Sequence, residues 1–155
     1  MRATIAATAA ADGFIDRWGI HERGILPVPI IQAARWSGWS VQFIGGMWPA
    51  MGIAYMLPNL RRIQVDENLA ACWQRTVIAH ELGHWLADHR GIHHCVSTRV
   101  VKRSAKEMVA DELAARLLVP EWAIERFPMM ELATRCQVPQ ALVDLRIGTC
   151  DLLLY

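Results

Sequence analysis

Hydrophobic and polar positions along the chain predict helices at both ends of the sequence and strands between them. Helical spacing is expected over 3–18 and 29–36. Alternating positions rich in β-branched and aromatic residues predict three short strands, at 39–44, 51–57 and 62–66. Turn residues at 45–46 and 58–59 separate these strands, and we therefore expect a small antiparallel sheet.

After the strands, the pattern returns to helical spacing. A long helix is expected over 68–89, with hydrophobic residues on several faces, as in a buried helix, and with Gly91 after its end. A second long helix over 104–119 stops at Pro120. Three short helices are expected at 121–126, 130–136 and 139–146. Helices before and after a small sheet predict the α+β class.

Composition and charge limit the classes of protein to which this chain can belong. The chain has 155 residues, of which 54% are hydrophobic and 20% charged, so it is long enough for one domain with its own core. The formal net charge of +1 excludes a protein that binds nucleic acid or an anionic membrane mainly by charge. The four cysteines are widely spaced, and the N-terminal segment lacks the features of a signal peptide. We expect reduced thiols and a cytoplasmic location.

One segment requires a membrane span to be considered. Residues 36–60 contain no charged side chain. Glycines, prolines and polar residues interrupt this segment, so two buried strands and a turn explain it better. No membrane association is expected.

Five of the six histidines lie within fifteen residues, and two of them belong to an HExxH motif, His80-Glu81-Leu82-Gly83-His84. On a helix, histidines four residues apart lie one turn apart on the same face, so both can bind one Zn²⁺ at about 2.0–2.1 Å. Glu81 lies beside the metal position, where its carboxylate can take a proton from water. Uncharged residues flank the motif, which favours a buried metal helix over an exposed helix with two surface histidines.

A catalytic zinc takes three protein ligands and leaves a fourth position open. The metzincin pattern HExxHxxGxxH does not apply, because Ala87 and Arg90 occupy its glycine and final histidine positions. A carboxylate from the next helix can complete the site instead, and Glu107 is the best placed candidate. Asp111 and Glu112 are the alternative ligands.

A zinc-bound histidine usually donates a hydrogen bond from its other ring nitrogen to a second group. Asp111 follows Glu107 by four residues on the same helix face, so we expect it to accept this hydrogen bond, from His80 in particular. Asp88, four residues after His84, is the alternative partner.

Other features fit structural roles as well as chemical ones. Ser104 and Glu107 match a capping box, in which Glu107 would bind a backbone N–H instead of a metal. His93-His94-Cys95 could form a second metal site, but no partner at zinc spacing follows, so we expect a polar loop. The seven tryptophans are expected in the core.

The two motifs together resemble the ImmA/IrrE family of zinc metallopeptidases. HELGH is followed by EMVADELAARLLVP, and the family's second motif reads approximately E-x-x-A-[ND]-x-F-A-x-x-L-L-x-P. The residues that match this second motif are Glu107, Ala110, Asp111, Ala114, Leu117, Leu118 and Pro120. Leu113 stands where phenylalanine is usual, and the likeness spans about 27–146.

The resemblance implies a zincin-like fold of the gluzincin type, in which His80, His84 and Glu107 hold one Zn²⁺ and Glu81 is the general base and acid. Members of that family are typically intracellular proteases of bacteria, phages or mobile elements that cleave DNA-binding repressors. The partner that the resemblance implies is therefore a protein substrate, such as a helix-turn-helix repressor. No direct binding of nucleic acid is expected.

With this resemblance, we expect residues 1–155 to form a single metallopeptidase domain. Its parts would be an N-terminal helix or arm without an assigned role (1–26), a catalytic core (27–127) and a closing helix pair (128–147). An extended substrate could add to the sheet at 51–57 or 62–66. The candidates for stabilising the oxyanion, by residue type alone, are Tyr55, Arg62, His93 and His94.

Two other classes of function stay open. Residues 130–146 have a helix-turn-helix outline, which would make the chain a DNA- or partner-binding regulatory module with a structural or vestigial metal site. Against this, the second helix, PQALVDLR, carries one arginine, and the turn lacks the usual glycine. The other class is a scaffold that keeps the fold without activity.

Overall fold

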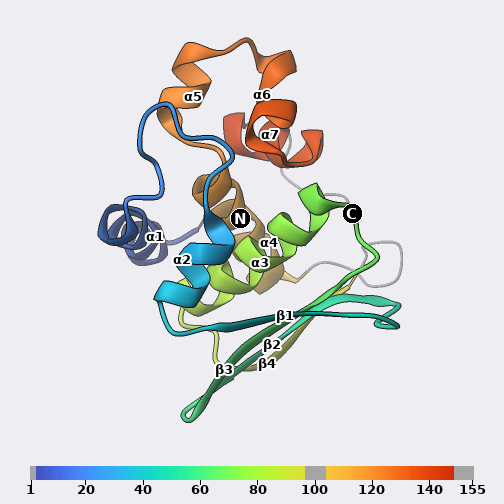
Figure 1. The fold of residues 1–155 in the computed structure, drawn as a ribbon. Helices are drawn as coiled ribbons and strands as arrows, with labels where there is room; N and C mark the ends of the chain where they lie inside the picture. The colour runs from blue at the N-terminus through green and yellow to red at the C-terminus, as the bar shows by residue number, and fades with distance from the viewer. Residues whose placement is uncertain (1–2, 97–103, 149–155) are drawn as a thin grey trace.

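The computed structural model describes residues 3–96 and 104–148 of the chain, and its helices and strands confirm the α+β class (Figure 1). The helices are α1 (Ile5–Trp18), α2 (Ile30–Trp36), α3 (Ala71–Leu86), α4 (Ala105–Leu118), α5 (Glu121–Arg126), α6 (Met129–Cys136) and α7 (Gln140–Ile147). The strands are β1 (Ser40–Ile44), β2 (Ala50–Leu57), β3 (Leu60–Asp66) and β4 (Gly91–Val96). In Figure 1 the sheet lies at the bottom and the helices lie above it.

The four strands form a mixed sheet in the order β1-β3-β2-β4. β2 pairs antiparallel with β3 and β4, whereas β1 pairs parallel with β3. The expectation of an antiparallel sheet is therefore wrong for β1: the turn at 45–46 does not form a hairpin, because β3 lies between β1 and β2. The turn at 58–59 does form one, with Leu57 opposite Leu60. Alternation along a strand indicates its buried face but does not identify its neighbours.

Two expectations about the sheet's edge are also wrong. The segments 51–57 and 62–66 belong to β2 and β3, which are the interior strands, so neither offers a free edge. The segment 93–95, expected as a polar loop, lies instead within β4, an edge strand among the described residues. Its residues alternate between more and less exposed positions, which is the pattern of a strand with one covered face.

α3 packs over one face of the sheet, and every residue from Arg75 to His84 is buried. The helix approaches the sheet closely at Gly52 of β2, where a β-carbon would lie 2.3 Å from Cγ1 of Val77. The helix ends at Leu86, earlier than expected, and the chain turns through Asp88, which has a positive φ of 61°. Gly91 accordingly begins β4 rather than ending the helix.

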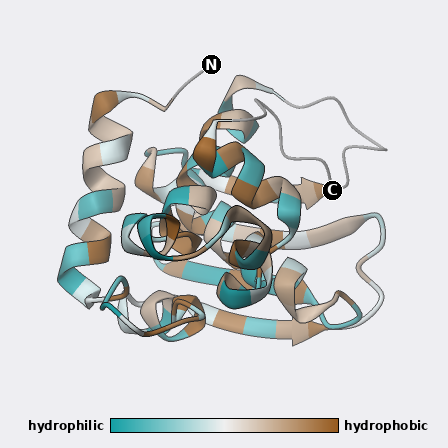
Figure 2. Cartoon of the chain, turned by 90° about the horizontal axis from the view of Figure 1, so that it is seen from above, coloured by the Kyte–Doolittle hydropathy of each residue, from teal (hydrophilic) through white to brown (hydrophobic). Residues whose placement is uncertain are grey.

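α1 lies along one side of the molecule, while hydrophobic residues gather in the central helices and strands (Figure 2). Arg116 of α4 donates two hydrogen bonds to the Asp12 carboxylate of α1, at 2.6 and 2.9 Å. The backbone N–H of Ala3 also donates to the carboxylate of Glu112. These contacts hold α1 against α4; the three-part division of the domain stays a prediction.

The tryptophans are less buried than expected. Trp39 is 3% exposed and belongs to the core, but Trp36 and Trp48 are 56% and 74% exposed. Hydrophobic spacing places an indole on the inner side of an element, yet it does not show whether another element covers the ring.

Among the helices that the structure describes, none is both long and apolar enough to span a membrane. The uncharged segment 36–60 contains β1 and β2, in agreement with the two strands expected there.

Candidate metal centre

Two histidines of α3 point their ring nitrogens at the same place. His80 and His84 lie one turn apart on the helix, and both are almost completely buried. Their Nε2 atoms are 3.1 Å apart, and their rings meet edge to face at 4.7 Å between centroids. The HExxH spacing therefore does bring two imidazole nitrogens together inside the protein.

A carboxylate from α4 completes this group. Glu107 Oε2 lies 3.2 Å from His80 Nε2, and Glu107 Oε1 lies 3.1 Å from His84 Nε2. Ser104 caps the start of α4, since its Oγ accepts the Glu107 backbone N–H at 3.3 Å. One half of the expected capping box is thus present, while the Glu107 side chain is directed at the histidines.

The three residues fit a divalent cation such as zinc. Ligands at about 2.0–2.1 Å in tetrahedral directions lie about 3.3 Å from one another, and the separations in this cluster are 3.1–3.2 Å. A second group, His80, Glu81 and Cys95, also has ligand atoms within 4.8 Å of one another. That group leaves out His84 and Glu107. A cation bound by it would therefore not lie between the Nε2 atoms of the two histidines and the Glu107 carboxylate, which are the ligand atoms at 3.1–3.2 Å from one another.

The outward nitrogens of the two histidines have different partners. His80 Nδ1 donates to Asp111 Oδ1 at 2.8 Å, as the helical spacing of Asp111 predicts, and Asp111 is 1% exposed. His84 Nδ1 lies 2.9 Å from His89 Nδ1. Asp88, the alternative expected from the sequence, instead pairs with Arg90 at 2.5 Å on the surface.

Burial and mutual contacts shift the pKa values of the cluster. Burial opposes the charged form of His80, but hydrogen bonds with Asp111 and Glu107 outweigh it and raise its pKa to about 10. Burial lowers the pKa of His84 to about 4. Burial would raise the pKa of Glu107, but its contacts with both histidines hold it well below the usual range. The cluster thus favours one positive charge between its members, which a metal cation can supply in place of a proton.

Glu81 is fully buried next to this cluster. Within the described residues, neither of its carboxylate oxygens has a hydrogen-bond partner. Burial raises the pKa of Glu81 to about 8, although the charge of His80 opposes the shift. A buried carboxylate without protein partners requires water, a proton or a cation beside it.

One further residue, His93 of β4, lies against the cluster. Its ring stacks on His84 at 4.5 Å between centroids, with 17° between the planes. Its neighbour His94 points to the opposite face, because successive side chains of a strand alternate. The strand alternation of 91–96 could have revealed this position, but the histidines made the segment resemble a loop.

The other oxyanion candidates lie on the face of the sheet that is remote from α3. Tyr55 is opposite Ile92 in β4 and opposite Arg62 in β3. Residues paired across antiparallel strands share a face, and Ile92 is on the same face as His94. Of the four candidates, therefore, the structure brings only His93 to the cluster.

The chain was compared with models of known protein families. Residues 49–147 match the family described as the IrrE N-terminal-like domain, Peptidase_M78. The match contains the HExxH motif, Glu107 and Asp111, and it begins later than the likeness expected from residue 27. No curated protein matches the chain closely enough to count as a relative.

Proposed function

The chain belongs to the ImmA/IrrE metallopeptidase family, that of the IrrE N-terminal-like domain, and from this premise we propose that it is a zinc-dependent endopeptidase. The observation that carries the proposal is the cluster of His80, His84 and Glu107 with the carboxylate of Glu81 beside it. This set contains three ligands of the types that zinc prefers and one acid–base group that is not needed as a ligand.

The chemistry divides between the metal and Glu81. When bound by His80, His84 and Glu107, a zinc ion supplies a Lewis acid that polarises the peptide carbonyl and makes water more acidic. The ionised carboxylate of Glu81 then accepts a proton from the attacking water and later returns it to the leaving amine. Glu81 can serve both steps because it lies fully buried beside the cluster, where a bound cation would favour its ionised, proton-accepting form.

β4 is the part of the sheet that suits an extended substrate. It is an edge strand among the described residues, and its inward residue His93 stacks on His84. A peptide that pairs with the outer edge of β4 would pass next to the cluster. The same position makes His93 our candidate for a group that touches the carbonyl oxygen during attack.

We further propose that the substrate is a DNA-binding repressor of the helix-turn-helix class and that cleavage takes place in the cytoplasm. This proposal rests on the family resemblance and on the widely spaced cysteines. The net charge of +1 supports recognition of a protein rather than direct binding of DNA.

Two measurements test the proposed function. Elemental analysis of the purified protein should find about one zinc ion per chain, and His80→Ala should lose it. Where a helix-turn-helix repressor is encoded beside its gene, the metal-loaded protein should cleave that repressor, with the fragments identified by mass spectrometry. A folded wild-type protein that takes up no divalent metal would refute the metalloenzyme. Metal binding without cleavage of that repressor would refute the proposed substrate.

A further inference from the structure

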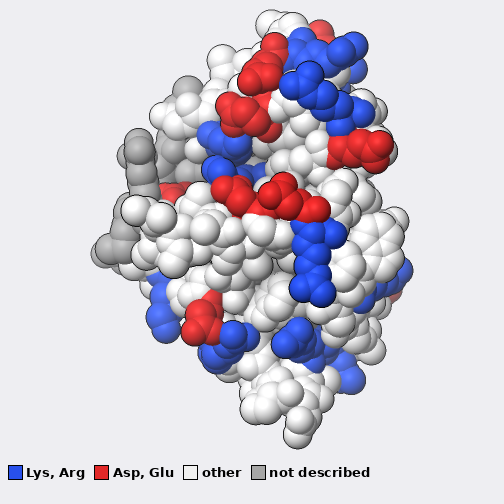
Figure 3. All heavy atoms as spheres, turned by 90° about the vertical axis from the view of Figure 1, so that its left-hand side faces the viewer, with Lys and Arg blue, Asp and Glu red and all other residues white. Residues whose placement is uncertain are grey.

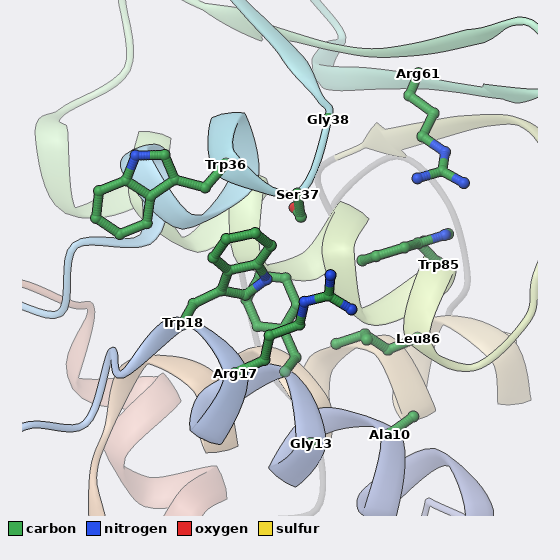
Figure 4. Close-up of a pocket in the computed structure, with 11 residues that line it drawn as sticks. Ala10, Gly13, Arg17, Trp18, Trp36, Ser37, Gly38, Arg61, Trp85 and Leu86 are labelled. Atoms are coloured by element: carbon green, nitrogen blue, oxygen red, sulfur yellow. The ribbon is translucent and has the colours of Figure 1, made fainter.

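A separate hollow lies between α1, α2, α3 and β3. We call it the tryptophan pocket and define it by Trp18, Trp36, Trp85, Arg17 and Arg61 (Figure 4). Its volume is about 530 Å³, and small-molecule sites usually have about 300–1,000 Å³. No residue of the metal cluster lines it.

Indole rings form its walls. Trp36 is 56% exposed, and its ring centroid lies 6.3 Å from that of Trp18, with 32° between the planes. Trp85 makes two edge-to-face contacts, with Phe14 at 6.2 Å and Trp39 at 5.8 Å between ring centroids. The pocket therefore presents aromatic surface that is supported by the core and is suited to stacking with a planar ring.

Two arginines give the pocket its charge. The Arg17 guanidinium lies 5.3 Å from the Trp18 ring, and that of Arg61 lies 5.3 Å from the Trp85 ring. No carboxylate of the described residues forms an ion pair with either arginine. A guanidinium stacked on an indole still has N–H groups at its edge, which bind phosphate or carboxylate in a fork.

The surface on this side of the molecule also carries basic side chains. The space-filling view in Figure 3 shows acidic and basic side chains together in the upper part of this side of the molecule. Its lower part, at the level of the sheet, carries mainly basic side chains. The three tryptophans lie in the last turns of their helices, whose ends carry partial negative charge, so a planar cation is the competing class of ligand. Two full charges without carboxylate partners favour an anion.

We propose that the tryptophan pocket binds a small molecule that combines a planar ring system with a phosphate or carboxylate group. The ring stacks on the indole surface of the pocket, and the anion is held by Arg17 and Arg61. Trp85 directly follows His84, so such a ligand contacts the helix that carries the metal cluster. Binding in this pocket does not depend on peptidase activity and is measured without it.

Isothermal titration calorimetry of the full chain tests the proposal. The probes separate the contribution of the planar ring from that of the anionic group. Adenosine 5′-monophosphate and 1-naphthoate each combine a planar ring with an anionic group, and we refer to both as planar anions. The first is a nucleotide and the second an aromatic carboxylate. Adenosine and inorganic phosphate each carry only one half of the chemistry, and N-methylquinolinium is a planar cation. We expect at least one planar anion to bind at one site per chain, at least about tenfold more tightly than these three controls.

Variants locate the binding. Trp36→Ala and Arg17→Gln should each raise the dissociation constant by about tenfold or more, while Trp36→Phe, which keeps a ring, should stay within about threefold. Trp48→Ala removes an exposed tryptophan elsewhere, and Arg126→Gln removes an arginine that lies over Phe127, so neither should change the affinity. The proposal is overturned if no planar anion binds saturably, if the cation binds as tightly, or if Trp36→Ala and Arg17→Gln leave binding unchanged.

Discussion

Gly83 of α3 and Ala110 of α4 are in direct backbone contact: a β-carbon on Gly83 would lie only 2.7 Å from the carbonyl oxygen of Ala110. Gly83 lies inside the HExxH motif, and Ala110 lies between Glu107 and Asp111. The absence of a side chain at Gly83 lets the two helices approach closely enough for Glu107 to reach both histidines.

Gly83→Ala should therefore damage both stability and the metal site. The added methyl group meets backbone atoms, which cannot rotate away, so we expect a loss of about 1–3 kcal/mol in the free energy of unfolding. Urea unfolding and zinc titration measure the two effects. The matched control is Gly13→Ala in α1, where no atom lies within 4 Å of the new β-carbon and stability should stay equal or rise. Equal results for the two variants would contradict the close contact.

Asp111→Asn should weaken zinc binding about 10- to 100-fold, because the charge that orients His80 and raises its basicity is lost. A competition titration against a chromogenic chelator measures the affinity. Glu112→Gln is the control, since Glu112 contacts the backbone of Ala3 at the other side of α4. If Glu112→Gln lost the metal while Asp111→Asn kept it, our assignment of these two residues would be reversed.

His89→Ala should weaken zinc binding about tenfold or more, because His84 Nδ1 would lose the partner that fixes its orientation. Asp88→Asn changes the neighbouring residue, which pairs with Arg90 on the surface, and it should leave the affinity unchanged. Asparagine also tolerates the positive φ at this position. If Asp88→Asn weakened zinc binding and His89→Ala did not, Asp88 would be the hydrogen-bond partner of His84, as the four-residue spacing alone predicts.

The sequence predicts the positions of most elements well, because each has strong local signals. The bounds of α5 are as expected, those of α4 differ from expectation by one residue at each end, and those of α6 differ by one residue at the start. It also predicts which side chains meet in the cluster, since one-turn spacing on α3 and α4 places His80 with His84 and Glu107 with Asp111.

The features that the sequence does not predict depend on which strands and helices pack together in the folded chain. The parallel pairing of β1 with β3 is not encoded in either strand's alternation, and the edge position of β4 follows from that order. The roles of His89 and His93 also depend on the tertiary structure. His89 reaches His84 from the segment that follows α3, and His93 faces α3 only because β4 pairs with β2.

His21 should make stability dependent on pH in the weakly acidic range. Burial is the main cause that lowers its pKa below 6.5, opposed by its hydrogen bond to the Leu117 carbonyl at 2.9 Å. The unfolded chain then binds more protons than the folded one between that lowered pKa and 6.5, so stability rises with pH through this window and falls on acidification. Urea unfolding at pH 7.5 and 5.5 should show that wild type loses more stability than His21→Gln. An identical loss would remove His21 as the cause.

The most direct test of the central claim, that this chain is a zinc peptidase with Glu81 as its acid–base group, is a comparison of wild type with Glu81→Gln, both loaded with zinc and given the same protein substrate. Glutamine keeps the size of the side chain but cannot accept the proton, so the variant should retain about one zinc per chain and lose at least about 10²-fold in cleavage rate. Undiminished cleavage by a zinc-loaded Glu81→Gln protein would contradict the account.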